Sequence, residues 1–114
     1  MRRVLEVIKA HNTANLPVIL TGDLNSFHGR VTTTPLSLAI GSGYYPSDLV
    51  AGTLVNGVYA SAHGFKATPR NSYRVDHILT TSSVVSTYFA VRRTSESTAP
   101  SDHHPVVATV NVYS

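Results

Sequence analysis

Apolar and polar positions at the start of the chain predict a helix followed by a strand. Apolar residues recur at helical spacing between residues 4 and 8, which predicts an amphipathic helix that ends near Asn12. Residues 16–20 form a short apolar run closed by Gly22, which predicts a buried strand. A polar loop is expected to follow over residues 23–33.

Cap signals predict a second, shorter helix. Thr34 suits an N-cap, Pro35 suits the first helical position, and Gly41 lies near the expected end. Residues 42–62 are rich in Gly, Ser, Tyr and Asn. For that stretch we expect loops, with one short strand at most.

The last third of the chain predicts three strands, over residues 73–80, 84–92 and 106–112. In the second of these, strict alternation would place Val85 and Phe89 on the same face. A polar loop is expected at residues 94–100. Helix, strand, helix and then strands predict an α/β fold in which a sheet packs under helices.

The composition limits which classes of protein and which kinds of site this chain can represent. A chain of 114 residues with 42% hydrophobic residues predicts a single globular domain, 1–114. The sequence has no cysteine, which excludes disulfides, thiolate nucleophiles and cysteine-based zinc sites. The formal net charge of +3 is compatible with a phosphorylated substrate.

The placement of acidic residues predicts a hydrolytic site. The chain has six Asp and Glu residues, and Asp23, Asp76 and Asp102 each lie beside a predicted strand. An ionised carboxylate next to a buried strand is costly unless a cation or a hydrogen-bond donor meets it. We therefore expect these acids to belong to a metal-assisted site.

Asp23 and Asn25 follow the first predicted strand. The carboxylate could bind a divalent cation or exchange a proton with water or a leaving oxygen. The amide could donate to a phosphoryl oxygen as negative charge builds on it. The alternative is an Asx-turn, in which these side chains bond to nearby backbone amides.

Asp102 and His103 precede the last strand. The imidazole could act as a general base or acid, and the oxygens of Asp102 suit Mg²⁺, Mn²⁺ or Ca²⁺. The alternative is a turn in which Ser101 or Asp102 satisfies backbone amides. Asp76 could orient a histidine ring, or instead pair with Arg74.

Three motifs together carry a family resemblance: Gly-Asp-Leu-Asn at 22–25, Arg-Val-Asp-His-Ile-Leu at 74–79 and Ser-Asp-His-His-Pro-Val at 101–106. In this combination the chain resembles the endonuclease/exonuclease/phosphatase superfamily, the DNase I-like proteins, from about Pro17 to Val110. Ser-Ala-His-Gly-Phe at 61–65 is also similar to a Thr-Phe-His-Gly-Phe stretch of some relatives. The resemblance implies part of a four-layer α/β/β/α sandwich, with a mixed, mostly antiparallel sheet and helices on one face.

The resemblance also implies a phosphoesterase that uses Mg²⁺ or Mn²⁺. Asp23 would match the acid that activates water or protonates the leaving group, and Asn25 the phosphate-binding amide. Asp76 would orient His103 at the scissile phosphate, and Asp102 would be a carboxylate on the metal side.

Further residues are candidates for contact with substrate. His63 could border the substrate site, and Arg74 could meet a phosphate, as could Arg30, Lys66 and Arg70. The substrate would be a phosphate ester, with nucleic acid and a phospholipid headgroup among the candidates. The sequence does not select among them.

The resemblance covers only the C-terminal half of the family's domain. An early Asn, the principal metal-binding Glu and a second His of the family have no counterpart here, so the metal site is expected to be incomplete. Half a sandwich also leaves an apolar sheet face uncovered. A missing N-terminal half, a second chain or a homodimer could cover it. The alternative function is a non-catalytic assembly or interaction module.

Overall fold

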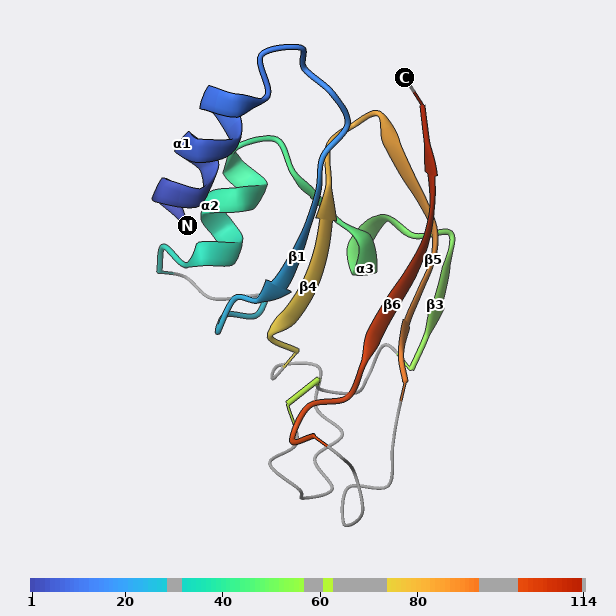
Figure 1. Ribbon diagram of the computed structural model, residues 1–114. Coiled ribbons are helices and arrows are strands. Elements are labelled where there is room, and N and C mark those ends of the chain that lie inside the picture. Colours follow the sequence, from blue (N-terminus) through green and yellow to red (C-terminus); the bar gives the residue numbers. More distant parts are fainter. Residues whose placement is uncertain (29–31, 57–60, 63–73, 93–100, 114) are drawn as a thin grey trace.

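The strands in the described part of the chain form two three-stranded sheets, and helices pack on one of them (Figure 1). A computed structural model describes residues 1–28, 32–56, 61–62, 74–92 and 101–113. The elements in chain order are α1 (Arg2–His11), β1 (Ile19–Asp23), α2 (Pro35–Gly41), β2 (Tyr45–Pro46), α3 (Ser47–Val50), β3 (Thr53–Val55), β4 (Asp76–Thr80), β5 (Val84–Val91) and β6 (Val106–Val112).

One sheet has the strand order β1-β4-β2 and the other the order β3-β5-β6. The pairs of β1 with β4, β2 with β4, and β5 with β6 are antiparallel, whereas β3 pairs with β5 in parallel. The predicted mixed, mostly antiparallel arrangement is therefore confirmed.

A hydrophobic core lies between the first sheet and the two longer helices, which cover the same side of it (Figure 1). Leu36 and Ala39 of α2 are 2% and 0% exposed, and Leu79 of β4 is 0% exposed. Tyr44 closes this cluster, and partly buried residues of α1 and β1 pack against it. The sheet that carries the predicted site is thus backed by a packed layer.

The capping signals of α2 are confirmed in detail. The Thr34 hydroxyl accepts a hydrogen bond from the Ser37 amide at 3.1 Å, and the Ser37 hydroxyl oxygen accepts one from the Thr34 amide at 2.8 Å. This reciprocal capping box satisfies two amides that the helix cannot pair internally. The predicted end of the first helix near Asn12 is also confirmed, because α1 ends at His11.

The first strand differs from its prediction in position and in burial. β1 begins at Ile19 and not at Leu16, and it includes Asp23 as its last residue. Asn12 explains the late start, because its side chain bonds both the amide and the carbonyl of Leu16, at 2.8 and 2.9 Å. Leu20 packs against the core on the helix side of the sheet, so the neighbouring Ile19 side chain points to the opposite face and is 47% exposed. The prediction of a buried strand was therefore wrong.

Residues 42–56 contain more regular structure than expected. The pattern predicted loops with one short strand at most, yet β2, α3 and β3 all lie there. Each element has four residues or fewer, which is too short to leave a periodic signal. The predicted loop at 94–100 lies outside the described residues.

A β-bulge breaks the predicted alternation of β5. The register with β6 shifts between Ser86 and Tyr88, so Thr87 is an extra residue. Val84 and Ser86 are buried before the bulge, whereas Phe89 and Val91 are buried after it. Val85 is 45% exposed and Phe89 is 1% exposed. Hence the prediction that these two residues share a face was wrong.

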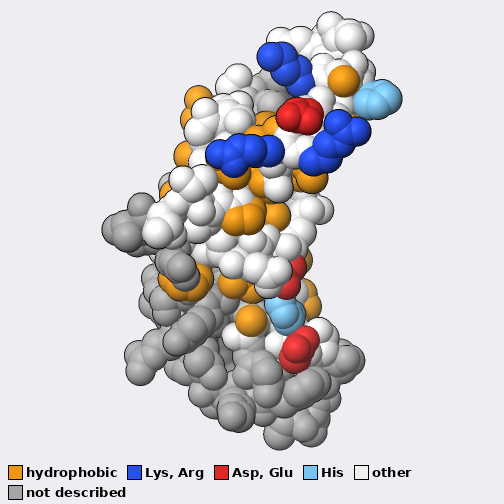
Figure 2. Space-filling model, turned by 90° about the vertical axis from the view of Figure 1, so that its left-hand side faces the viewer, with side chains coloured by type: hydrophobic (Ala, Val, Ile, Leu, Met, Phe, Trp, Pro, Cys, Tyr) orange, Lys and Arg blue, Asp and Glu red, His pale blue; other side chains and the backbone are white. Residues whose placement is uncertain are grey.

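The surface of the helical side has an uneven distribution of charge. Figure 2 shows Lys and Arg side chains gathered near the end of the molecule that carries α1, together with acidic and histidine side chains. Among the described residues drawn farther toward the other end, acidic and histidine side chains are visible but no Lys or Arg. Arg2, Arg3 and Lys9 all belong to α1 and are exposed. Among the described helices, none is long and apolar enough to cross a membrane.

Candidate active site

Strand pairing brings two of the predicted acids together at one end of the first sheet. Asp23 is the last residue of β1 and Asp76 is the first residue of β4, and the antiparallel register places them opposite each other. Like charges at directly opposed positions repel. A group that carries a proton or positive charge is therefore needed between them.

His103 occupies that position. Its Nδ1 lies 2.5 Å from Oδ2 of Asp76, and its Nε2 lies 3.9 Å from Oδ2 of Asp23. Because a carboxylate accepts, the ring donates from Nδ1 and keeps Nε2 for proton exchange. We call Asp76 and His103 the dyad. One ligand atom each of Asp23, Asp76 and His103 lies within 4.8 Å of the others.

The acids around His103 change its protonation. The hydrogen bond to Asp76 raises the pKa of the imidazole above its ordinary value, and partial burial opposes this rise. The negative charges of Asp76, Asp102 and Asp23 raise that pKa further. A larger fraction of the ring is therefore protonated near neutral pH, where it can donate a hydrogen bond or a proton to an oxyanion.

The two oxygens of Asp23 have different environments. Oδ1 accepts a hydrogen bond from the Asn25 amide at 2.9 Å, while Oδ2 faces His103. Asn25 has a left-handed backbone, with φ of 50°, which Asn tolerates better than most residues. The Asx-turn considered as an alternative is thus present, and it orients the Asp23 carboxylate toward His103.

Asp102 lies on the more exposed side of the dyad. Its side chain is 58% exposed, and Oδ1 is 3.9 Å from Nε2 of His103. The Ser101 hydroxyl accepts a hydrogen bond from the His103 amide at 3.1 Å, so the turn considered as an alternative is also present here. The structure thus brings Asp23, Asp76, Asp102 and His103 to one rim.

Arg74, one of the residues predicted to contact substrate, is buried and does not lie exposed at the rim. Arg74 is 6% exposed, and its guanidinium bonds Oδ2 of Asp48 at 2.9 and 3.2 Å. It also lies over the ring of Phe89, with 5.8 Å to the centroid. Because Arg74 is buried and already paired with a carboxylate, we do not carry it into the proposed substrate site. His63, Arg30, Lys66 and Arg70 lie outside the described residues.

A buried polar cluster that the sequence did not predict lies behind this rim. His77 follows Asp76 in β4, is 2% exposed, and donates from Nε2 to the backbone carbonyl of Ser26 at 2.7 Å. His28 Nε2 bonds Oδ2 of Asp48 at 2.9 Å, and its ring meets that of His77 edge-on at 5.5 Å. Asp48 is one of only six acids and lies beside Leu49 and Val50. An acid beside apolar residues, in a chain with few acids, was the signal that could have marked Asp48 as part of a buried site.

The positive charge of Arg74 indicates that this cluster has a structural role and does not bind a metal ion. His28, Asp48 and His77 each offer a ligand atom within 4.8 Å of the others, yet the Arg74 guanidinium already bonds the same Asp48 oxygen as His28. That fixed positive charge opposes a metal cation. Burial raises the pKa of Asp48, but the hydrogen bonds and charges of His28 and Arg74 outweigh it, and the net shift is downward.

The burial of the His77 side chain is expected to make folding stability depend on pH. Burial is the largest influence and lowers the pKa of this imidazole below its ordinary value of 6.5. Between the folded and unfolded pKa values the unfolded chain binds more protons, so stability falls as the pH drops below about 6.5. We expect His77→Gln, which keeps a donor, to reduce this loss in urea unfolding at pH 7.5, 6.5 and 5.5. An unchanged pH profile in that variant would contradict the prediction.

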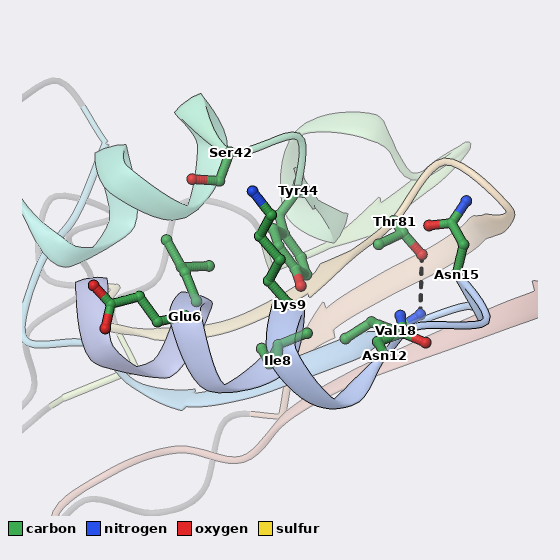
Figure 3. Close-up of a pocket in the computed structure, with 10 residues that line it drawn as sticks. Glu6, Ile8, Lys9, Asn12, Asn15, Val18, Ser42, Tyr44 and Thr81 are labelled. Carbon is green, nitrogen blue, oxygen red and sulfur yellow. Dashed lines mark hydrogen bonds between the residues drawn. The ribbon is translucent and has the colours of Figure 1, made fainter.

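A pocket of about 530 Å³ lies at the opposite end of the sheet (Figure 3). Its lining includes Val18, which precedes β1, and Thr81, which follows β4; the Thr81 hydroxyl accepts from the Val18 amide at 3.0 Å. α1 contributes Glu6 and Lys9 to the wall. Of the predicted site residues that the structure describes, none lines this pocket, so we do not assign the chemistry to it.

Comparisons with known proteins agree on the fold. No family model and no curated protein matches the sequence. Solved structures do match, among them an endonuclease/exonuclease/phosphatase from Bacteroides vulgatus, with a TM-score of 0.77 and 20% identity over 97% of this chain. The chain has part of the DNase I-like fold of the endonuclease/exonuclease/phosphatase proteins. The predicted fold class is thus confirmed.

Two further structures with this endonuclease/exonuclease/phosphatase fold are similar. A mannosyl-6-phosphatase from Bacteroides thetaiotaomicron matches 96% of this chain with a TM-score of 0.78 and 24% identity. A family protein from Leptotrichia buccalis matches 97% with a TM-score of 0.71 and 19% identity. The chain covers 42 to 43% of the length of these three proteins, so it spans less than half of each.

Proposed function

We propose that this chain carries part of the active site of a divalent-metal-dependent phosphoesterase. The observation that carries the proposal is the bond between Asp76 and His103, with Asp23 and Asp102 both 3.9 Å from Nε2 of the ring. A carboxylate-oriented histidine beside further carboxylates is suited to proton transfer and to charge development on phosphorus oxygens. The fold of the similar structures supports the same reaction class.

Each residue at the rim has a distinct part in the proposed reaction. Asp76 holds the His103 ring with Nε2 directed to the open rim, where the protonated ring donates to a phosphoryl oxygen. Asp23 is placed by its Asx-turn to exchange a proton with the attacking water or the leaving oxygen. Asn25 is exposed at this turn, and its side-chain amide donates to a second phosphoryl oxygen.

The donors at the rim fit a hard divalent cation. Asp23 and Asp102 present exposed carboxylate oxygens, with side chains 39% and 58% exposed, and oxygen donors are those that Mg²⁺ and Mn²⁺ prefer. We assign Asp102 as the ligand, because Asp76 is already bonded to His103. When bound, the cation would neutralise charge that develops on the phosphate.

The proposed substrate is a phosphate ester. One similar structure is a mannosyl-6-phosphatase, which makes a sugar phosphate a candidate beside nucleic acid and a phospholipid headgroup. Large apolar side chains are exposed on the second sheet, among them Leu54, Val85 and Val112 at 48%, 45% and 56%. They support the proposal that a missing N-terminal half, a second chain or a homodimer covers this region.

The metal dependence can be tested with chelator and one variant. Hydrolysis of phosphomonoesters and phosphodiesters by the intact protein should stop in EDTA and return with Mg²⁺ or Mn²⁺. Removing a direct ligand in Asp102→Ala should raise the Mg²⁺ concentration needed for half-maximal rate by at least about tenfold. Glu6→Ala removes an exposed acid of α1 and should change nothing. Full activity in EDTA, or no ester hydrolysed with either metal, would overturn the proposal.

A further inference from the structure

Ser61 connects the two segments that carry the dyad. Its side-chain oxygen accepts hydrogen bonds from the Val75 and Asp76 amides, at 2.9 and 3.1 Å. Its backbone carbonyl accepts from the His104 amide at 2.6 Å. The next residue, Ala62, forms an isolated antiparallel bridge with His103. One residue thus contacts the backbone at Asp76 on one side and the backbone beyond His103 on the other.

The strand pattern explains why a side-chain acceptor is needed here. β4 pairs with β2 only at Leu79 and Thr80, so among the described residues β2 offers no partner to the amides at the start of β4. Buried amides without a partner are rare in proteins. Ser61 is 0% exposed, so water cannot easily replace its hydroxyl. The Val75 carbonyl accepts from the Leu24 amide at 2.9 Å, which fixes the same peptide from the β1 side.

We propose that Ser61 is a positioning residue for the dyad. Its hydroxyl fixes the backbone from which the Asp76 carboxylate projects, and its carbonyl fixes the backbone that follows His103. The distance between Asp76 and His103 therefore depends on a residue whose hydrogen bonds are to backbone atoms. The effect on catalysis rests on the proposed function, whereas the effect on the geometry of the dyad does not.

The test compares two buried serines in the intact, metal-free protein. Ser61→Ala removes the acceptor of both amides. Ser47→Ala is the matched control, because Ser47 is also 0% exposed and its hydroxyl bonds another hydroxyl, that of Ser86, at 2.8 Å. Both variants delete one buried oxygen and leave the rim residues unchanged. Any effect specific to Ser61 then reports on its contacts with the dyad segments.

Two NMR measurements do not depend on activity. In Ser61→Ala the Val75 and Asp76 amides should exchange with deuterium at least about tenfold faster relative to the core amide of Leu79. The downfield Nδ1–H signal of His103 should weaken or disappear. In Ser47→Ala both observations should match the wild type. Unchanged exchange and an unchanged imidazole signal in Ser61→Ala, or the same changes in Ser47→Ala, would overturn the proposal.

Kinetics supply the third measurement. A small displacement of reacting groups costs about 10²-fold in rate, so Ser61→Ala should lower kcat to that extent and leave KM nearly unchanged. If Ser61→Ala does not fold, Ser61→Cys takes its place, because sulfur is a weak acceptor, and the same NMR changes are expected at smaller amplitude. A protein without phosphoesterase activity that still shows the NMR changes would contradict the proposed function and support this one.

Discussion

His103→Ala is expected to lower kcat on a phosphate ester by roughly 10²- to 10⁴-fold, the usual contribution of a positioned acid–base group. The imidazole lies between Asp76 and Asp23, and alanine leaves these carboxylates facing each other with no donor between them. The side chain is 29% exposed, so its removal creates no closed cavity. Steady-state kinetics with saturating Mg²⁺ would measure the loss.

The matched control is His11→Ala, because His11 is an exposed histidine in the last turn of α1. That variant should retain wild-type kcat. Urea unfolding of both variants separates lost chemistry from lost structure, since both should unfold near the wild-type midpoint. Wild-type turnover in folded His103→Ala would refute the assignment of the dyad.

Asp48→Ala is expected to lower the free energy of unfolding by about 3 to 5 kcal/mol, as when one partner of a buried ion pair is removed. The Asp48 side chain is 3% exposed and bonds both Arg74 and His28 through the same oxygen. Alanine would leave the Arg74 guanidinium buried without its carboxylate. Because many domains have only about 5 to 15 kcal/mol of stability, this single change could unfold much of the protein. Urea unfolding would measure it.

A double variant separates the burial of charge from the loss of packing. Asp48→Leu combined with Arg74→Met removes both charges while keeping apolar volume, and it should be more stable than Asp48→Ala by more than about 1 kcal/mol. Asp102→Ala removes an exposed carboxylate and should change stability by no more than about 0.5 kcal/mol. A loss in Asp48→Ala as small as that would show that the pair with Arg74 contributes little.

The rim could be predicted from the sequence because its residue types are unusual for their positions. Acids are scarce in this chain, and three of them lie beside strands, so the grouping of Asp23, Asp76 and Asp102 followed from the cost of isolated charge. The helix α2 was equally predictable, because Thr34 and Pro35 act locally. Their effect depends on neighbours within one turn and not on the rest of the fold.

Other features could not be predicted because they depend on contacts between distant segments. Asp48 is 26 residues from Arg74 in sequence, and although an acid beside apolar residues is unusual, its neighbours do not show which distant cation it meets. The role of Ser61 depends on amides 14 and 15 residues away. The bulge at Thr87 is visible only in the register with β6. In each case the structure depends on contacts between distant segments, and the local pattern of residues does not indicate those contacts.

The opposition of Asp23 and Asp76 across β1 and β4 means that the rim forms only when these two strands pair in the correct register. A slip of one residue between these strands would exchange Asp76 for Val75 or His77 at the rim and turn the remaining side chains to the other face. Such a molecule could still collapse and bury apolar surface, yet Asp76 would no longer be placed to bond Nδ1 of His103. Enzymatic competence would therefore report correct strand alignment, and a preparation with full secondary structure but low specific activity would point to misaligned molecules.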